Sequence, residues 1–239
     1  AGGYLILRLS PLFMNTWLAK MAAVIGAFSF AAAALLAALQ RTDKRVQALM
    51  TVSSLGLVLT LACIPEVQAI YAAILLLVWH GAAKALLLLC ADRAPSSRFS
   101  ANLVLLGGLA MLLPPFVGPV AQWTALGASV RNPVALGLMI AGCVFWMIVW
   151  TRYVGACLTS VIAGVAAAPG SRLAAAAQLI LSAAVIGLSA FSVPFTNYYI
   201  APVLTENFAR FEDVAQGKAG AFLIQDFSGV NPEWLLAAV

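Results

Sequence analysis

Two side chains that can carry a proton, His80 and Lys84, stand four residues apart in a long apolar run. The run covers residues 68–89, is long enough to cross a bilayer as a helix, and is interrupted near its middle by this pair. On a helix the spacing places both side chains on one face, one turn apart. An ammonium near the bilayer centre costs at least about 2.5–3.5 kcal/mol, so we expect Lys84 to face protein or enclosed water and not lipid.

The chemistry open to this pair is proton transfer. Imidazole titrates near neutral pH and burial favours the uncharged form of an amine, so both groups can take up and release a proton. A structural lysine that pairs with a neighbouring helix is the other interpretation of the same residues. The stretch by itself leaves both open.

The composition places these residues in a membrane protein. Hydrophobic residues make up 64% of the 239 and charged residues 9%, with a mean hydropathy of +1.02, which excludes a soluble globular domain. The net charge of +5 comes from single bases between apolar runs, so we expect a lipid bilayer and not nucleic acid as a partner. The cysteines are far apart and form no Cys-x-x-Cys pair, so we expect buried thiols and no metal site on this chain: Cys63, Cys90, Cys143 and Cys157.

We expect an all-α, polytopic integral membrane protein with about six transmembrane helices. The apolar runs predict spans at residues 16–39, 46–64, 68–89, 101–130, 133–157 and 173–193. The fourth run is longer than one straight crossing needs and contains Pro114 and Pro115, which remove two amide donors. It should therefore be a discontinuous helix, enclosed by protein or lining a cavity.

The chain divides into three parts. Residues 1–15 are expected to end a preceding helix, and residues 16–203 to form the transmembrane bundle. Residues 204–239 hold five of the eight acidic residues, interleaved with aromatic ones. This pattern suits an amphipathic C-terminal tail on the membrane surface or on a neighbouring subunit, and a solvated, loosely ordered tail is the alternative.

Positive charge predicts the orientation of the spans. Three bases, Arg8, Lys20 and Arg131, fall on one side before the tail begins. The other side, which we take as cytoplasmic, has seven: Arg41, Lys44, Arg45, Arg93, Arg98, Arg152 and Arg172. The C-terminus is then expected outside.

Four motifs follow one another in a fixed order: Thr42-Asp-Lys-Arg-Val, Thr51-Val-Ser-Ser-Leu-Gly, His80-Gly-Ala-Ala-Lys-Ala-Leu-Leu-Leu-Leu and Leu113-Pro-Pro-Phe-Val-Gly. With the opening Ala1-Gly-Gly-Tyr-Leu, they make the chain resemble the antiporter-like subunits of respiratory complex I, Mrp antiporters and membrane-bound group 4 nickel–iron (NiFe) hydrogenases. Each motif is weak by itself, but four in register over residues 1–127 are specific. Residues 128–239 are similar only in hydropathy pattern. The stretches Ser53-Ser-Leu-Gly-Leu and Leu-Leu-Leu-Cys90 look most like the energy-converting hydrogenase branch.

The resemblance implies that the chain is the C-terminal half of such a subunit: the second of two inverted five-helix repeats, plus a closing helix. It implies a relay along a hydrated polar axis, with His80 and Lys84 as relay residues. Polar residues that could line this axis and bind water are Gln122, Thr51, Ser53 and Ser54. Hydroxyl-to-backbone bonding is the commoner use of the last three.

The chain departs from the family pattern at three points. The family usually carries a lysine or glutamate where Gln122 stands, and glutamine cannot ionise. Its Tyr-Ser ahead of Thr51 is replaced by Leu49-Met50. The first repeat is not within these residues.

Our leading expectation is a membrane subunit of a complex I-like, redox-driven ion pump of the energy-converting hydrogenase type, relaying H⁺ or Na⁺. The chain itself would have no catalytic centre, cofactor or metal, whereas partner subunits would carry iron–sulfur and nickel–iron centres. Its partners would be other membrane subunits and, indirectly, soluble redox subunits. The chain itself would lie in the inner (cytoplasmic) membrane of a prokaryote. One rival is a non-conducting scaffold derived from an antiporter subunit. Another is an autonomous secondary transporter, disfavoured because one inverted repeat leaves no partner half.

Overall fold

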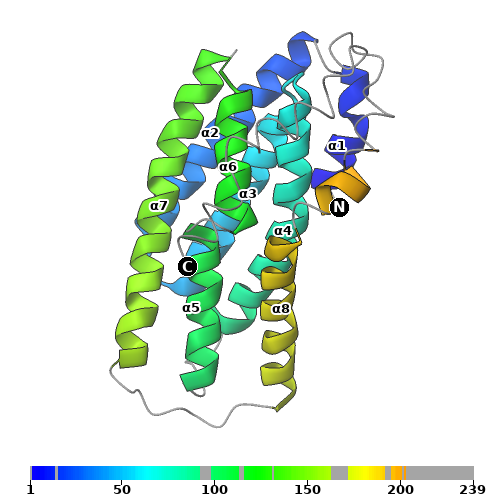
Figure 1. The fold of residues 1–239 in the computed structure, drawn as a ribbon. Helices are drawn as coiled ribbons and strands as arrows, with labels where there is room; N and C mark the ends of the chain where they lie inside the picture. The colour runs from blue at the N-terminus through cyan, green and yellow to red at the C-terminus, as the bar shows by residue number, and fades with distance from the viewer. Residues whose placement is uncertain are drawn as a thin grey trace.

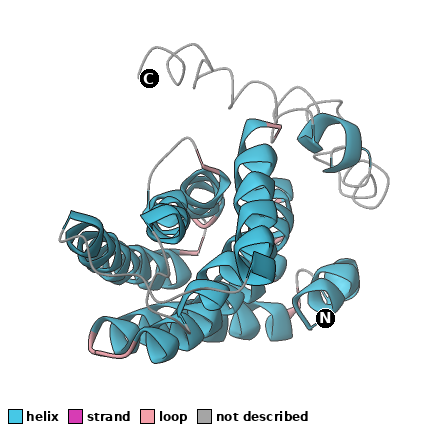
Figure 2. Cartoon of the chain, turned by 90° about the horizontal axis from the view of Figure 1, so that it is seen from below, coloured by secondary structure: helices cyan, strands magenta, loops and turns pink. Residues whose placement is uncertain are grey.

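The computed structural model of the chain describes residues 2–13, 16–91, 98–112, 116–130, 132–162, 172–191, 195–200 and 202. Within these ranges every regular element is helical (Figures 1 and 2). The elements are α1 (Gly2–Phe13), α2 (Trp17–Ala38), α3 (Asp43–Ala62), α4 (Val67–Ala91), α5 (Arg98–Leu112), α6 (Val117–Ala128), α7 (Pro133–Ile162), α8 (Arg172–Ala190) and the π-helix η1 (Thr196–Ile200). The predicted tail, residues 204–239, lies outside the described residues.

The described helices confirm the all-α, polytopic architecture. Five stretches are long and apolar enough to cross a membrane: Trp17–Ala38, Asp43–Ala62, Val67–Leu89, Leu105–Ala128 and Pro133–Ala156. Where the sixth span was predicted, α8 contributes a shorter apolar stretch, Ala175–Ala190. The chain is therefore a multi-pass membrane protein whose spans follow the apolar runs of the sequence.

The fourth span consists of two helices. α5 ends at Leu112 and α6 begins at Val117, and α6 continues above α5 in Figure 1. Phe116, just before α6, has an extended backbone with φ −70° and ψ 148°, so a new helix starts here. The predicted break at Pro114 and Pro115 falls in this interval, although the two prolines lie outside the described residues.

α2 and α3 cross with their backbones in contact. A Cβ atom at Gly26 would lie 2.7 Å from the carbonyl oxygen of Gly56, and one at Gly56 would lie 2.8 Å from the backbone nitrogen of Phe30. The Ser53 hydroxyl donates a hydrogen bond across the crossing to the Phe30 carbonyl at 2.9 Å. Small residues are thus required here, as is common where membrane helices approach closely.

α7 also fixes the end of α2. The Arg152 guanidinium on α7 donates to the carbonyl oxygens of Ala38 and Gln40, both at 2.5 Å. The last carbonyls of a helix have no partner within the helix itself. Arg152 therefore caps α2 and joins it to α7.

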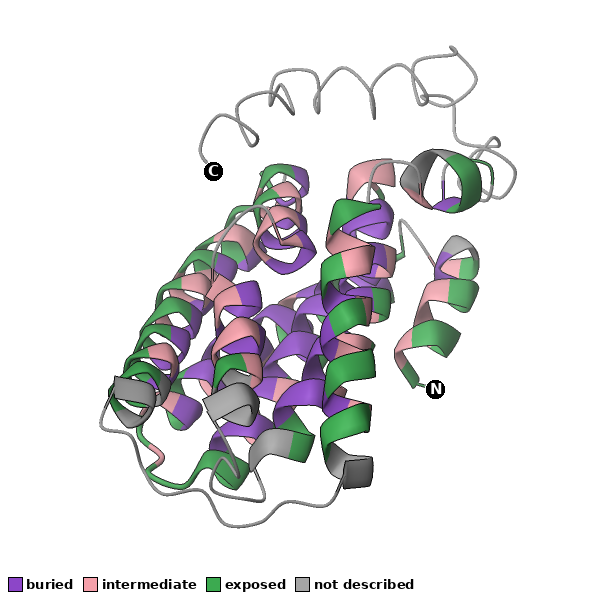
Figure 3. Cartoon of the chain, turned by 60° about the horizontal axis from the view of Figure 1, so that its bottom comes forward, coloured by how far each residue is buried: buried purple, intermediate pink, exposed green. Residues whose placement is uncertain are grey.

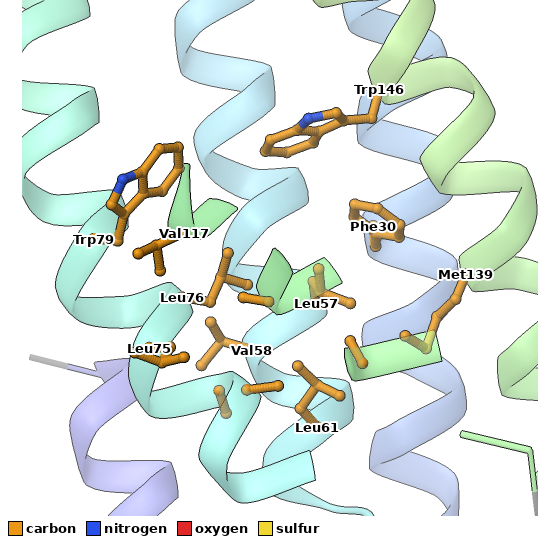
Figure 4. Packing of buried hydrophobic residues seen from close by; sticks show 14 of the residues in the cluster. Phe30, Leu57, Val58, Leu61, Leu75, Leu76, Trp79, Val117, Met139 and Trp146 are labelled. Carbon is orange, nitrogen blue, oxygen red and sulfur yellow. The ribbon is translucent and has the colours of Figure 1, made fainter. Parts of the chain in front are cut away.

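The core lies between helices that surround α4. α4 packs against α3, α6 and α8, while α7 packs against α2 and α5. In Figure 4 the Trp79 ring lies beside Val117, and Phe30 faces Trp146 with the ring centroids 6.1 Å apart. Buried residues occupy the inward faces of the helices and exposed ones the outward faces (Figure 3). The outward faces are themselves apolar, for example at Phe28 and Ile148, as a surface in contact with lipid requires.

Candidate functional site

His80 and Lys84 both lie in the protein interior, on α4. Lys84 is 4% exposed and His80 is 8% exposed, so neither faces the outer, apolar surface of the bundle. His80 is close to the middle of the span Val67–Leu89. Lys84 is one turn, about 6 Å, nearer the Leu89 end. The structure thus places the amine inside the protein.

Lys84 is bound by oxygen atoms of α3. Its Nζ donates to the side-chain Oε1 of Gln47 at 3.0 Å and to the backbone carbonyl oxygen of the same residue at 3.3 Å. On α7, the Trp150 ring lies with its centroid 5.1 Å from Nζ. An ammonium is attracted to the face of an indole ring at this distance. Three helices therefore meet at the amine.

The partners of Lys84 are neutral. The carboxylates within the described ranges are Asp43 and Glu66, which stand at the first turn of α3 and just before α4. Within those ranges Lys84 forms no ion pair, and no group of three or more His, Cys, Asp or Glu side chains comes together that could hold a metal ion. The ammonium is stabilised by a carboxamide, a carbonyl and an aromatic ring, none of which carries a formal charge.

The three hydroxyl residues predicted near the site all donate to backbone carbonyls. Thr51 Oγ1 donates to the Gln47 carbonyl at 2.8 Å, the same oxygen that accepts from Lys84. Ser54 donates to Met50 at 2.8 Å, and Ser53 donates to Phe30 in α2. Of the three, the structure connects Thr51 alone to the lysine site through a shared oxygen.

Gln122 lies on α6, which packs against α4. It is 8% exposed, and its Nε2 has no hydrogen-bond partner among the described residues. One turn earlier, a Cβ atom at Gly118 would lie 2.5 Å from the Trp79 ring, so the absence of a side chain there is what seats Trp79 against α6. Trp79 precedes His80 in α4, so the Gly118 turn of α6 packs next to the histidine turn, and Gln122 stands one turn further along α6.

Sequence reasoning missed two residues of this site, Gln47 and Trp150. Gln47 is fully buried and stands one turn before Thr51 in α3, so its polar side chain on the Thr51 face was a usable signal. Trp150 is also fully buried, but nothing in its sequence context distinguishes it from a core tryptophan. Both residues have a buried N–H group without a partner in the described part of the chain, Gln47 Nε2 and Trp150 Nε1.

This arrangement can hold a proton and release it. The amine can exist charged, with its N–H groups on oxygen, and no described carboxylate fixes that charge. The imidazole one turn away on the same face is a second group able to accept a proton. The site has the groups that proton transfer needs.

The sequence of this chain matches a family of membrane subunits. The sequence model described as NADH:quinone oxidoreductase/Mrp antiporter, transmembrane, matches residues 1–166. No curated protein matches the chain. The family match includes His80, Lys84, Gln47, Gln122 and Trp150, and it continues past residue 127, where the recognisable motifs end. The chain therefore belongs to the NADH:quinone oxidoreductase/Mrp antiporter family of membrane subunits.

Proposed function

We propose that this chain is the ion-translocating membrane subunit of a complex I-like assembly driven by electron transfer, of the energy-converting hydrogenase type. Lys84 and His80 form its relay, which moves H⁺ or couples proton movement to Na⁺. Members of this family normally act within multi-subunit membrane complexes. Electron transfer takes place in partner subunits that carry iron–sulfur and nickel–iron centres, and this chain contributes the membrane path.

The observation that carries the proposal is the environment of Lys84. The amine is 4% exposed inside a membrane bundle, yet its described partners are the uncharged Gln47 and Trp150. A buried cation is costly, and a purely structural lysine is best stabilised by a carboxylate partner. Neutral partners allow the amine to alternate between its charged and uncharged forms.

The decisive test is Lys84→Met in the intact membrane assembly, with Lys20→Met as the matched control. Lys20 is an exposed lysine in the first turn of α2, so its replacement removes the same charge away from the core. Lys84→Met should abolish ion translocation in membrane vesicles while electron transfer persists, and Lys20→Met should leave both intact. Undiminished pumping by Lys84→Met would refute the relay.

We further propose that the chain lies in the cytoplasmic membrane of a prokaryote, with the turn between α2 and α3 inside and the C-terminus outside. The bases Arg41, Lys44 and Arg45 at this turn support the orientation. A cysteine placed at Thr42, which is exposed, should react with an impermeant maleimide in inside-out vesicles only. Labelling in right-side-out cells would reverse the assignment.

Gln122 favours a second candidate function, a non-conducting membrane scaffold. Gln122 is buried on α6, one turn beyond the contact between Gly118 and Trp79, and glutamine cannot ionise. Gln122→Lys separates the two candidates, because a conducting subunit should gain translocation from an added carrier. A scaffold should only become less stable, since the new ammonium is buried without a described partner.

A further inference from the structure

We infer that Gln47 is a positioning residue for Lys84, whose carboxamide meets the amine in both of its protonation states. The inference rests on the proposed relay function and adds a residue to it. It concerns the contact between α3 and α4, where a polar side chain that is fully buried reaches the one buried ammonium of the described core.

The geometry ties the two side chains together. Gln47 Oε1 accepts from Lys84 Nζ at 3.0 Å, and the Gln47 carbonyl accepts from the same nitrogen at 3.3 Å. That carbonyl also accepts from Thr51 Oγ1 at 2.8 Å. Gln47 therefore offers a backbone oxygen fixed within α3 and a side-chain amide that can rotate.

The amide can serve a neutral amine as well as an ammonium. With Lys84 protonated, Oε1 accepts one of the three N–H groups, as observed. Gln47 Nε2 is buried and has no partner among the described residues. Once Lys84 loses its proton, a half-turn of the amide brings Nε2 round to donate to the nitrogen lone pair. The N–H bond of Lys84 that released the proton is the bond that breaks, the rotation of the amide changes none, and one side chain supports both states.

Neither a carboxylate nor an aliphatic side chain at position 47 could hydrogen-bond Lys84 in both of its protonation states. An ionised carboxylate accepts but cannot donate, so it would hold the proton on Lys84. An aliphatic side chain offers neither group and would leave the ammonium with fewer acceptors. The Trp150 ring, whose centroid lies 5.1 Å from Nζ, adds attraction for the charged form alone. Gln47 is therefore the partner that can accept a hydrogen bond from the ammonium and donate one to the neutral amine.

Few other titratable or charged side chains of the described helices lie where they could change the protonation of Lys84. His80 is on α4 itself, one turn away. On α3, Asp43, Lys44 and Arg45 are exposed in the first turn. On α7, the Arg152 guanidinium caps α2, and the Tyr153 ring packs edge-on against Trp150 with centroids 5.5 Å apart. On α1, Tyr4 and Arg8 are exposed, and the buried polar side chains of α6 and α8 do not titrate: Gln122, Gln178 and Ser182.

The test follows the protonation of Lys84 directly in the full-length chain, labelled with ¹⁵N-lysine and held in lipid bilayers. The Lys84 resonance is the one that disappears in Lys84→Met. The titration midpoint of this resonance is compared in the parent, Gln47→Glu and Gln47→Met. Thr60→Val is the matched control, because Thr60 is a buried polar residue of the same helix whose hydroxyl bonds to the Gly56 carbonyl and not to Lys84.

Gln47→Glu should raise the midpoint by about one to three pH units, since an opposite charge at this distance favours the ammonium. Gln47→Met should lower it by about one unit, because an acceptor for the ammonium is lost. Thr60→Val should leave it unchanged. At neutral pH, Gln47→Glu should slow ion translocation by the intact assembly about tenfold or more. A titration midpoint raised by one pH unit makes release of the proton from Lys84 about tenfold less favourable.

A midpoint that stays at the parent value in Gln47→Glu overturns the inference, and this holds even if Gln47→Met fails to fold. The failure of the relay itself is a separate result, since it is read from translocation by Lys84→Met. Shifts of opposite sign in the two Gln47 variants, with a normal Thr60→Val control, support Gln47 as the positioning residue.

Discussion

Replacing Gly56 by alanine should loosen the crossing of α2 and α3 far more than the same change at a glycine that faces open space. A methyl group at Gly56 would lie 2.8 Å from the backbone nitrogen of Phe30 and 2.9 Å from the carbonyl oxygen of Gly26. Unstrained contacts of this kind begin near about 3.4 Å, so the helices must separate by roughly 0.6 Å. Neither neighbour is a side chain that can turn away.

The cost has two parts. Overpacking against a rigid neighbour costs about 1–3 kcal/mol. Separation also strains the hydrogen bond from Ser53 to the Phe30 carbonyl, whose loss costs about 1 kcal/mol. Alanine gains about 0.5–1 kcal/mol over glycine in any helix interior, and the control Gly137→Ala, with nothing within 4 Å of its Cβ, shares this gain. The expected difference between the two variants is about 2–4 kcal/mol.

The assay is unfolding of the full-length protein in mixed micelles with increasing SDS, followed by circular dichroism. Gly56→Ala should unfold at a clearly lower SDS fraction than Gly137→Ala, and Gly26→Ala should behave like Gly56→Ala. Equal midpoints for Gly56→Ala and Gly137→Ala would mean that the two backbones are not in contact, and the described crossing would be wrong.

Two further predictions concern the ends of helices. Arg152→Met removes both donors that cap α2, so hydrogen exchange of amides in the last turn of α2 should speed up about fivefold, equivalent to about 1 kcal/mol, while Arg152→Lys should restore part of the protection. The exchange rate in that turn, measured by mass spectrometry, checks this, and an unchanged rate would exclude the capping role. Cys63 is buried at the end of α3, so N-ethylmaleimide should modify it at least about a hundredfold more slowly in the folded protein than in SDS. Peptide mapping gives the two rates, and comparable rates would show that the α3–α4 turn is open.

The sequence predicted the helices and the burial of Lys84 inside the protein because both follow from local rules. Apolar runs of bilayer length must be helices, and the cost of an ammonium in lipid sends Lys84 inward. The neighbours of Lys84 depend on how each helix is rotated about its axis. α7 is apolar around most of its circumference, so no pattern fixed its rotation and Trp150 was not found. α3 did offer a pattern, the polar Gln47 one turn before Thr51, but it was not used to predict the site.

The hydroxyl residues of α3 show what helix geometry alone could have indicated. At 100° per residue, Thr51 lies about 40° from Gln47, whereas Ser53 lies about 160° from Thr51, on the far side of the helix. One helix cannot present all of these residues to one site. Only Thr51 shares an oxygen with Lys84, while Ser53 bonds across to α2.

The position of Lys84 along its apolar span would make the membrane voltage act unequally on the two legs of a proton path through it. At 1.5 Å per residue, the amine-bearing residue is about 8 Å from the Leu89 end of its span and about 26 Å from the Val67 end. A unit charge that crosses the whole membrane does work of about 2.3 kcal/mol per 100 mV. About three quarters of that work then falls on the longer leg, toward Val67. An electrical field across the membrane would therefore govern proton exchange with the distant face far more strongly than exchange with the near one.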